Sequence, residues 1–163
     1  LAAAAVLEAV GIAPTEIPAA LEVVPASAAR QKLHRDAAGR LIIDDTYNAS
    51  PLSVRAALDL TAAQPGARRV AILADMLEMG EIAVESHRAI GAYAAGRVDL
   101  VIGVGPLARQ IADAEGGAAQ WFPDKAALRT ALASLLREGD VVLVKGSRGM
   151  EMEEVVGWLA PII

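Results

Sequence analysis

From residue 30 onward, short apolar runs alternate with helical segments, and this alternation is what most restricts the fold. Strand-like runs fall at residues 31–35, 41–45, 69–74, 99–103, 119–122 and 140–145. Helical patterns fall at residues 51–63, 84–95, 106–113, 124–136 and 151–159. Strands that alternate with helices in this way favour a sheet of parallel strands. We therefore predict a Rossmann-like α/β fold, with a mainly parallel sheet of about six strands and helices on both faces.

The composition argues against several classes of function. The 163 residues are 55% hydrophobic but only 3% aromatic, so they supply an aliphatic core and few stacking platforms for single-stranded nucleic acid. A net charge of -5 also disfavours a phosphate backbone as partner. Without cysteine there are no disulfides or thiolate metal sites, and two histidines are too few for a histidine metal cluster. No apolar run reaches the ~20 residues of a membrane span. From these features together we expect a cytoplasmic protein, with neither nucleic-acid nor membrane partners.

The segment Ile42–Pro51 combines the end of a buried strand, two carboxylates and a helix start. Ser50 followed by proline is typical of an N-cap and a first helical position. Asp44, Asp45 and Asn48 therefore follow a strand directly, at the edge where open α/β sheets bind ligands. The helix start adds free N–H groups there. The alternative is that these polar side chains only cap the turn, and the sequence leaves both interpretations open.

A second polar loop begins at Asp75, directly after the strand expected at 69–74. A carboxylate in that position can orient a ligand or a neighbouring cation. Alternatively it is an ordinary loop carboxylate, with Met76 and Met79 packed into the core. We expect His87, in the helix that follows, to lie on the helix surface or behind the site rather than to act as a general base.

A third loop combines two cations, a hydroxyl and two glycines after the strand expected at 140–145. It contains Lys145, Ser147 and Arg148. Glycine lets the backbone approach a ligand, and arginine binds a carboxylate or phosphate through two parallel hydrogen bonds. The loop is therefore a candidate anion site, with a plain basic turn as the alternative.

The run Gly103-Val104-Gly105-Pro106-Leu107-Ala108 matches the dinucleotide pattern G-x-G-x-x-G/A, and Asp124 follows at about the usual spacing. However, Pro106 removes one N–H that a pyrophosphate needs, so NAD binding is the weaker interpretation. The P-loop pattern G-x-x-x-x-G-K-[S/T] is absent from the sequence. This chain therefore cannot hold a nucleoside triphosphate in the P-loop manner by itself, and we expect it to contribute half of a site.

Four of these motifs, in this order, resemble the C-terminal domain of the Mur ligases. They are Asp44–Pro51, Asp75–Glu81 followed by His87 and Arg88, Gly103–Ala108, and Val144–Met150. Within the family they are most similar to the ligases that join D-alanyl-D-alanine to UDP-N-acetylmuramoyl-tripeptide. The resemblance implies that residues 25–163 are the C-terminal domain and that residues 1–24 are a remnant of the central ATP-binding domain.

The resemblance also implies a reaction. The intact enzyme would use ATP and Mg²⁺ to convert the terminal carboxylate of the tripeptide into an acyl phosphate, which the amine of D-alanyl-D-alanine attacks to form an amide. This is a step of bacterial peptidoglycan precursor synthesis. The P-loop and the magnesium ligands would lie in the missing central domain, so this part is predicted to be inactive without the N-terminal and central domains.

Site residues follow from the same resemblance. On the ATP side it implies Arg30, either Asp44 or Asp45, Tyr47 and Asn48, and we favour Asp45 of the two carboxylates. On the D-alanyl-D-alanine side it implies Asp75, Lys145, Ser147 and Arg148. No catalytic residue and no metal ligand is expected in this part. Another Mur or folylpolyglutamate-type ligase, or a non-catalytic Rossmann-like nucleotide-binding module, remains the alternative.

Overall fold

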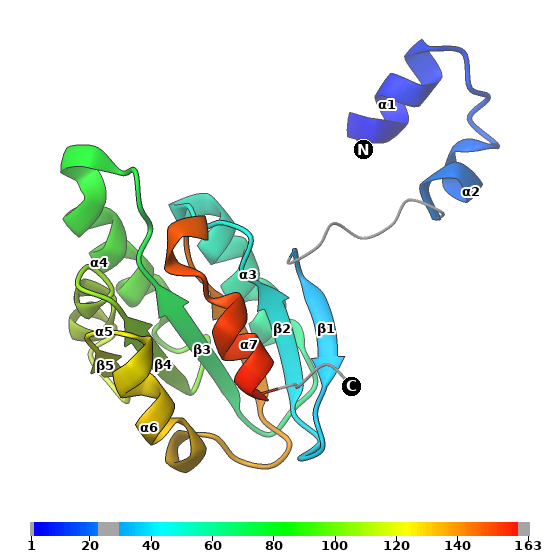
Figure 1. Ribbon diagram of the computed structural model, residues 1–163. Helices are drawn as coiled ribbons and strands as arrows, with labels where there is room; N and C mark the ends of the chain where they lie inside the picture. Colours follow the sequence, from blue (N-terminus) through cyan, green and yellow to red (C-terminus); the bar gives the residue numbers. More distant parts are fainter. Residues whose placement is uncertain (1, 23–29, 160–163) are drawn as a thin grey trace.

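The computed structural model describes residues 2–22 and 30–159, and its centre is one six-stranded sheet (Figure 1). The strands are β1 (Lys32–Arg35), β2 (Leu41–Asp45), β3 (Arg69–Ala74), β4 (Leu100–Val104), β5 (Gln120–Phe122) and β6 (Val141–Lys145). Their order across the sheet is β1-β2-β6-β3-β4-β5. Only β1 runs antiparallel to its neighbour, and every other pair is parallel. The predicted fold class is confirmed.

Helices cover both faces of the sheet. The helices α3 (Pro51–Ala63), α4 (Ala83–Ala94) and α5 (Arg109–Glu115) pack on one face, and α6 (Lys125–Leu135) and α7 (Glu153–Leu159) pack on the other. Alternate residues of each central strand enter the two layers, as Ile43 and Ile42 of β2 do. A strand buried on both faces needs a continuous apolar run, which is the pattern that the sequence shows.

Two further helices precede the sheet in the chain. They are α1 (Ala2–Ala9) and α2 (Ile17–Glu22), which contact each other. The predicted domain boundary at residue 25 lies outside the described residues.

Two helices begin later than predicted, and the backbone explains both differences. The helix expected at 106–113 begins at Arg109, because Gly105 has a φ of 109° and the chain turns there before the helix starts. The helix expected at 151–159 begins at Glu153. A short 3₁₀ turn, η2 (Arg148–Met150), precedes it. Glu151 follows this turn, and its left-handed φ of 50° interrupts a right-handed helix.

The strand order brings distant loops together at one edge. Because β2, β6, β3 and β4 are parallel neighbours, the loops that follow them all leave from their carboxyl ends. In the register, Lys145 at the end of β6 stands beside Asp45 on one side and Leu73 on the other. Three of the four polar loops singled out in the sequence therefore meet around the end of the last strand.

Candidate functional site

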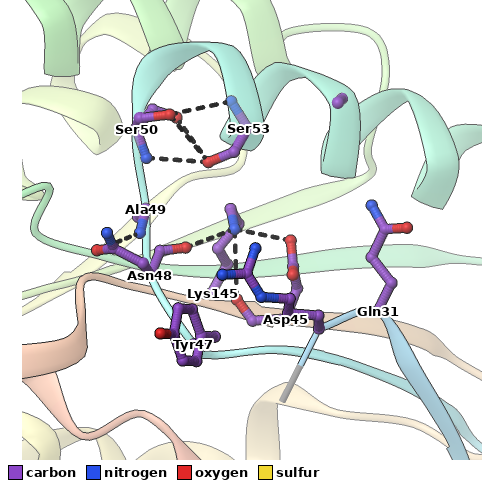
Figure 2. Close-up of a pocket in the computed structure, with 10 residues that line it drawn as sticks. Gln31, Asp45, Tyr47, Asn48, Ala49, Ser50, Ser53 and Lys145 are labelled. Carbon is purple, nitrogen blue, oxygen red and sulfur yellow. Dashed lines mark hydrogen bonds and ion pairs between the residues drawn. The ribbon is translucent and has the colours of Figure 1, made fainter. Parts of the chain in front are cut away.

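A pocket of about 450 Å³ opens at this edge, between the loop after β2, the start of α3 and the end of β6 (Figure 2). Its lining consists of Arg30, Gln31, Asp45, Tyr47, Asn48, Ala49, Ser50, Ser53, Ala56 and Lys145. Four of the five residues expected on the ATP side are in this set, together with Lys145, which was expected on the dipeptide side. The set mixes cations, a carboxylate, hydroxyls and one aromatic ring.

Lys145 forms the floor of the pocket and is only 2% exposed. Its Nζ donates to Oδ2 of Asp45 at 2.7 Å and to the carbonyl oxygen of Asn48 at 2.7 Å, and lies 3.4 Å from the carbonyl oxygen of Asp45. An ammonium has three protons, and these three oxygens of one loop surround it. Figure 2 shows the three contacts converging on the nitrogen.

At the mouth of the pocket an arginine stacks on a tyrosine. The guanidinium carbon of Arg30 lies 4.1 Å from the ring centre of Tyr47, which is 43% exposed. This distance is within the range of a cation–π interaction. The pair therefore presents a flat aromatic surface and a positive charge beside the opening.

The two adjacent carboxylates of β2 have different surroundings. Oδ1 of Asp44 accepts hydrogen bonds from the backbone N–H of Thr46 at 3.2 Å and from its hydroxyl at 2.7 Å. Asp44 therefore caps the turn, which is the alternative that the sequence left open, and it does not line the pocket. Asp45 does line the pocket. The side chain of Asn48 also serves the turn, because its Oδ1 accepts from the N–H of Ala49.

The start of α3 supplies the opposite wall. Ser50 is the N-cap and Pro51 the first helical residue, as predicted, and Ser50 and Ser53 exchange hydrogen bonds in a capping box. Sequence reasoning missed Ser53 and Gln31 as lining residues. The spacing of Ser50 and Ser53, which is that of a capping box, could have indicated Ser53. No local pattern indicated Gln31, whose φ of 49° turns the chain into β1.

A second group of polar residues lies where the loops after β3 and β6 meet. The hydroxyl of Ser147 accepts from the N–H of Leu77 at 2.8 Å, and the N–H of Ser147 donates to the carbonyl of Asp75 at 3.1 Å. Both Ser147 and Asp75 are buried. Arg148, in contrast, has an exposed side chain whose nearest partner is Glu153 at 3.7 Å. Ser147 thus ties two loops together, while Arg148 points outward beside them.

The carboxylate of Asp75 faces the glycine loop Gly103–Ala108. Its Oδ1 accepts from the N–H of Ala108 at 2.7 Å, and a Cβ on Gly105 would lie within 2.9 Å of the whole carboxylate. The loop therefore binds an anion of its own chain, and the charge on Asp75 repels a pyrophosphate approaching the same N–H. This arrangement argues against the NAD interpretation.

His87 is fully buried, so the predicted position on the helix surface is wrong, whereas the alternative position behind the site agrees with the structure. Its Nε2 accepts from the N–H of Met76 at 2.9 Å, which leaves the proton on Nδ1 to donate to the carbonyl of Ala83. Met76 is itself in the core. The helical pattern did not predict a buried histidine, because the backbone N–H that binds it, that of Met76, lies in the preceding loop.

Two absences concern the described residues, 2–22 and 30–159. Within them no three carboxylate or imidazole side chains gather closely enough to hold a metal ion. None of the helices in these ranges combines the length and apolar character that a membrane crossing requires.

Comparison with known proteins gives one consistent family. Residues 29–148 match the family model described as "Mur ligase, glutamate ligase domain". The UDP-N-acetylmuramoyl-tripeptide--D-alanyl-D-alanine ligase of Escherichia coli is 41% identical over 160 residues, an alignment that covers 96% of this chain and 35% of that protein. The chain therefore spans about a third of the length of this relative.

Solved structures agree. MurF from Acinetobacter baumannii matches with a TM-score of 0.88 at 29% identity, over 97% of this chain and 35% of that one. MurF from Thermotoga maritima, solved in complex with ADP, matches with a TM-score of 0.76 at 27% identity, over 93% of this chain and 34% of that one. These relatives come from bacteria and share the fold described above.

Proposed function

Because this chain belongs to the Mur ligase family, as its C-terminal glutamate ligase domain, we propose that it serves an ATP-dependent ligase that joins D-alanyl-D-alanine to UDP-N-acetylmuramoyl-tripeptide. The observation that carries the proposal is the pocket at the carboxyl edge of the sheet, which combines an arginine, a carboxylate and a tyrosine in a chain similar to such ligases. The reaction forms peptidoglycan precursors in the bacterial cytoplasm.

On the nucleotide side, the polar groups of the pocket suit ATP. The guanidinium of Arg30 can bind phosphate oxygens, and the carboxylate of Asp45 can accept from ribose hydroxyls. Tyr47 and Asn48 line the same cleft. When bound, ATP supplies the phosphoryl group that activates the carboxylate of the tripeptide. We propose that the central domain holds the Mg²⁺.

On the dipeptide side, we assign Ser147, Arg148 and Asp75. The exposed guanidinium of Arg148 suits the carboxylate of D-alanyl-D-alanine. Asp75 is buried, so its negative charge would attract the ammonium group of the dipeptide at a distance, without contact. In the reaction the ammonium first loses a proton. The neutral amine then attacks the acyl carbon of the acyl phosphate, the new C–N bond forms, and the C–O bond to phosphate breaks as phosphate leaves. These residues bind and orient the incoming amine, and no residue of this chain is assigned to the bond-making step itself.

The proposal extends to the organisation of the longer enzyme. Residues 1–24 would belong to the central domain and residues 25–163 to the domain that closes over it. The N-terminal and central domains would supply the P-loop and the magnesium ligands, so this chain alone would be inactive.

The test is an assay of ADP release by the full-length enzyme that contains this chain. We expect release to require both UDP-N-acetylmuramoyl-tripeptide and D-alanyl-D-alanine. Replacing Arg148→Ala removes a charge-assisted pair and should raise the KM for the dipeptide by about tenfold or more, with the KM for ATP unchanged. The matched control is Arg137→Ala, an exposed arginine before β6 that lies outside both the pocket at the carboxyl edge and the groove between α6 and α7.

Other outcomes separate the alternatives. Release that depends on a single amino acid in place of the dipeptide would indicate another Mur or folylpolyglutamate-type ligase. Nucleotide binding without release under any combination of substrates would indicate a non-catalytic module.

A further inference from the structure

We infer that Lys145 is a positioning residue. It holds Asp45 and the loop that ends at Asn48 in the conformation that binds nucleotide, and it does not itself contact ATP or the dipeptide. The inference rests on the proposed function and assigns Lys145 a different role from the substrate contact that the sequence suggested.

The first argument is burial. Lys145 is the last residue of β6, between β2 and β3, and only 2% of it is exposed. A lysine that contacts a diffusing substrate needs its ammonium accessible, whereas here protein oxygens surround the ammonium. A charge this deeply buried is tolerated only with a counter-charge and hydrogen bonds. Asp45 supplies the counter-charge at 2.7 Å, and the carbonyl of Asn48 accepts a hydrogen bond.

The second argument is the position of these partners in the chain. Asp45 and Asn48 stand at the two ends of the turn that carries Tyr47 into the pocket, and both bind one nitrogen atom. The ammonium therefore fixes the width of the turn. It also binds one carboxylate oxygen of Asp45, and this contact orients the second carboxylate oxygen toward a ligand hydroxyl. Without the ammonium, the carbonyl of Asn48 would lose its partner, and the buried carboxylate of Asp45 would lose its counter-charge, which is costly.

The chain provides a matched control in Lys125, at the start of α6. Its Nζ also pairs with a carboxylate, Glu154 at 3.0 Å, and with a backbone carbonyl, that of Glu151 at 3.2 Å. However, its side chain is 22% exposed and it lies in a different surface groove. The same substitution at both lysines therefore distinguishes the general effect of losing a lysine–carboxylate pair from the specific effect of losing the pair between Lys145 and Asp45.

The experiment compares Lys145→Met, Asp45→Asn, the double variant and Lys125→Met in the full-length enzyme. We expect Lys145→Met to raise the KM for ATP and the dissociation constant of ADP by about tenfold or more, because the Asp45 turn is released. The KM for D-alanyl-D-alanine should stay within about twofold. The effect of the double variant on the KM for ATP should fall well below the product of the two single effects, since Lys145 and Asp45 act as one pair. Lys125→Met should behave as the unmodified enzyme.

Several results would overturn the assignment. One is a raised KM for the dipeptide with ATP unaffected, and another is an effect of the double variant equal to the product of the single effects. If Lys145→Met does not fold, Lys145→Gln keeps a donor for Asn48 and gives the same readout; failure of that variant to fold would make the residue purely structural. Calorimetry with ADP keeps the test separate from the proposed function, because it needs no ligase activity.

Discussion

His87 shows how a single side chain supports the site from behind. The imidazole accepts from the N–H of Met76 and donates to the carbonyl of Ala83, so it joins the loop after β3 to the start of α4. The bond to Met76 is buried, and an unpaired backbone group there is costly. The loop held in this way also carries Asp75 and Leu77, which bind the other loops of the edge.

Replacing His87→Ala should therefore lower the free energy of unfolding by about 2 to 3 kcal/mol, because it leaves the N–H of Met76 unpaired and opens a cavity. Equilibrium unfolding in urea measures the change. The control is the neighbouring Arg88→Ala, which removes only an exposed hydrogen bond to Gln110 and should cost less than about 0.5 kcal/mol. Equal effects of the two substitutions would contradict the role given to the imidazole.

At this scale the sequence named several of the residues that line the pocket, but it did not predict that Lys145 joins the ATP-side group or what each residue contacts. Asp45, Tyr47, Asn48 and Lys145 were all named, and they line one pocket. What could not be predicted was the partner of each group, because Lys145 meets Asp45 across 100 residues of chain. That contact depends on the pairing of β2 with β6, which no local pattern specifies.

Among the elements, α4 and α5 approach each other closely at Gly91. A Cβ built on Gly91 would overlap with the carbonyl oxygen of Ile111, a backbone atom that cannot move aside by itself. Glycine at this point therefore sets the distance between the two helices. Gly157 in α7 has no such neighbour, since nothing lies within 4 Å of the same built atom.

The two glycines make opposite predictions for one substitution. Gly91→Ala should destabilise the fold by about 1 to 3 kcal/mol, because the helices must separate. Gly157→Ala should stabilise it by up to about 1 kcal/mol, because alanine favours a helix and meets open space. Thermal unfolding of both variants measures the difference. A stabilising Gly91→Ala would show that α4 and α5 do not pack as described.

The strands and helices themselves were predictable from periodicity. The ranges expected for β2, β3 and α3 agree with the structure at both ends. The late starts of α5 and α7 were not predictable. In the first case the chain turns at Gly105, whose φ is 109°, and in the second the backbone is left-handed at Glu151. Both result from contacts or conformations that helical propensity does not describe.

For the whole molecule, the insertion of the last strand into the middle of the sheet is what completes the site. β6 lies between β2 and β3, so the loops after all three strands meet only when β6 has joined the sheet. The pocket and the polar contacts of Ser147 then form around the end of one strand. The central claim is that this carboxyl edge is the ligand-binding face of the domain.

Hydrogen–deuterium exchange of the full-length enzyme, with and without Mg-ADP and then with D-alanyl-D-alanine, tests that claim most directly. We predict that Mg-ADP slows backbone exchange between Asp45 and Ser53, and that the dipeptide adds protection at Ser147 to Gly149. Exchange in α6 should stay unchanged. Protection confined to Gly103–Ala108, or to the groove between α6 and α7, would contradict the account.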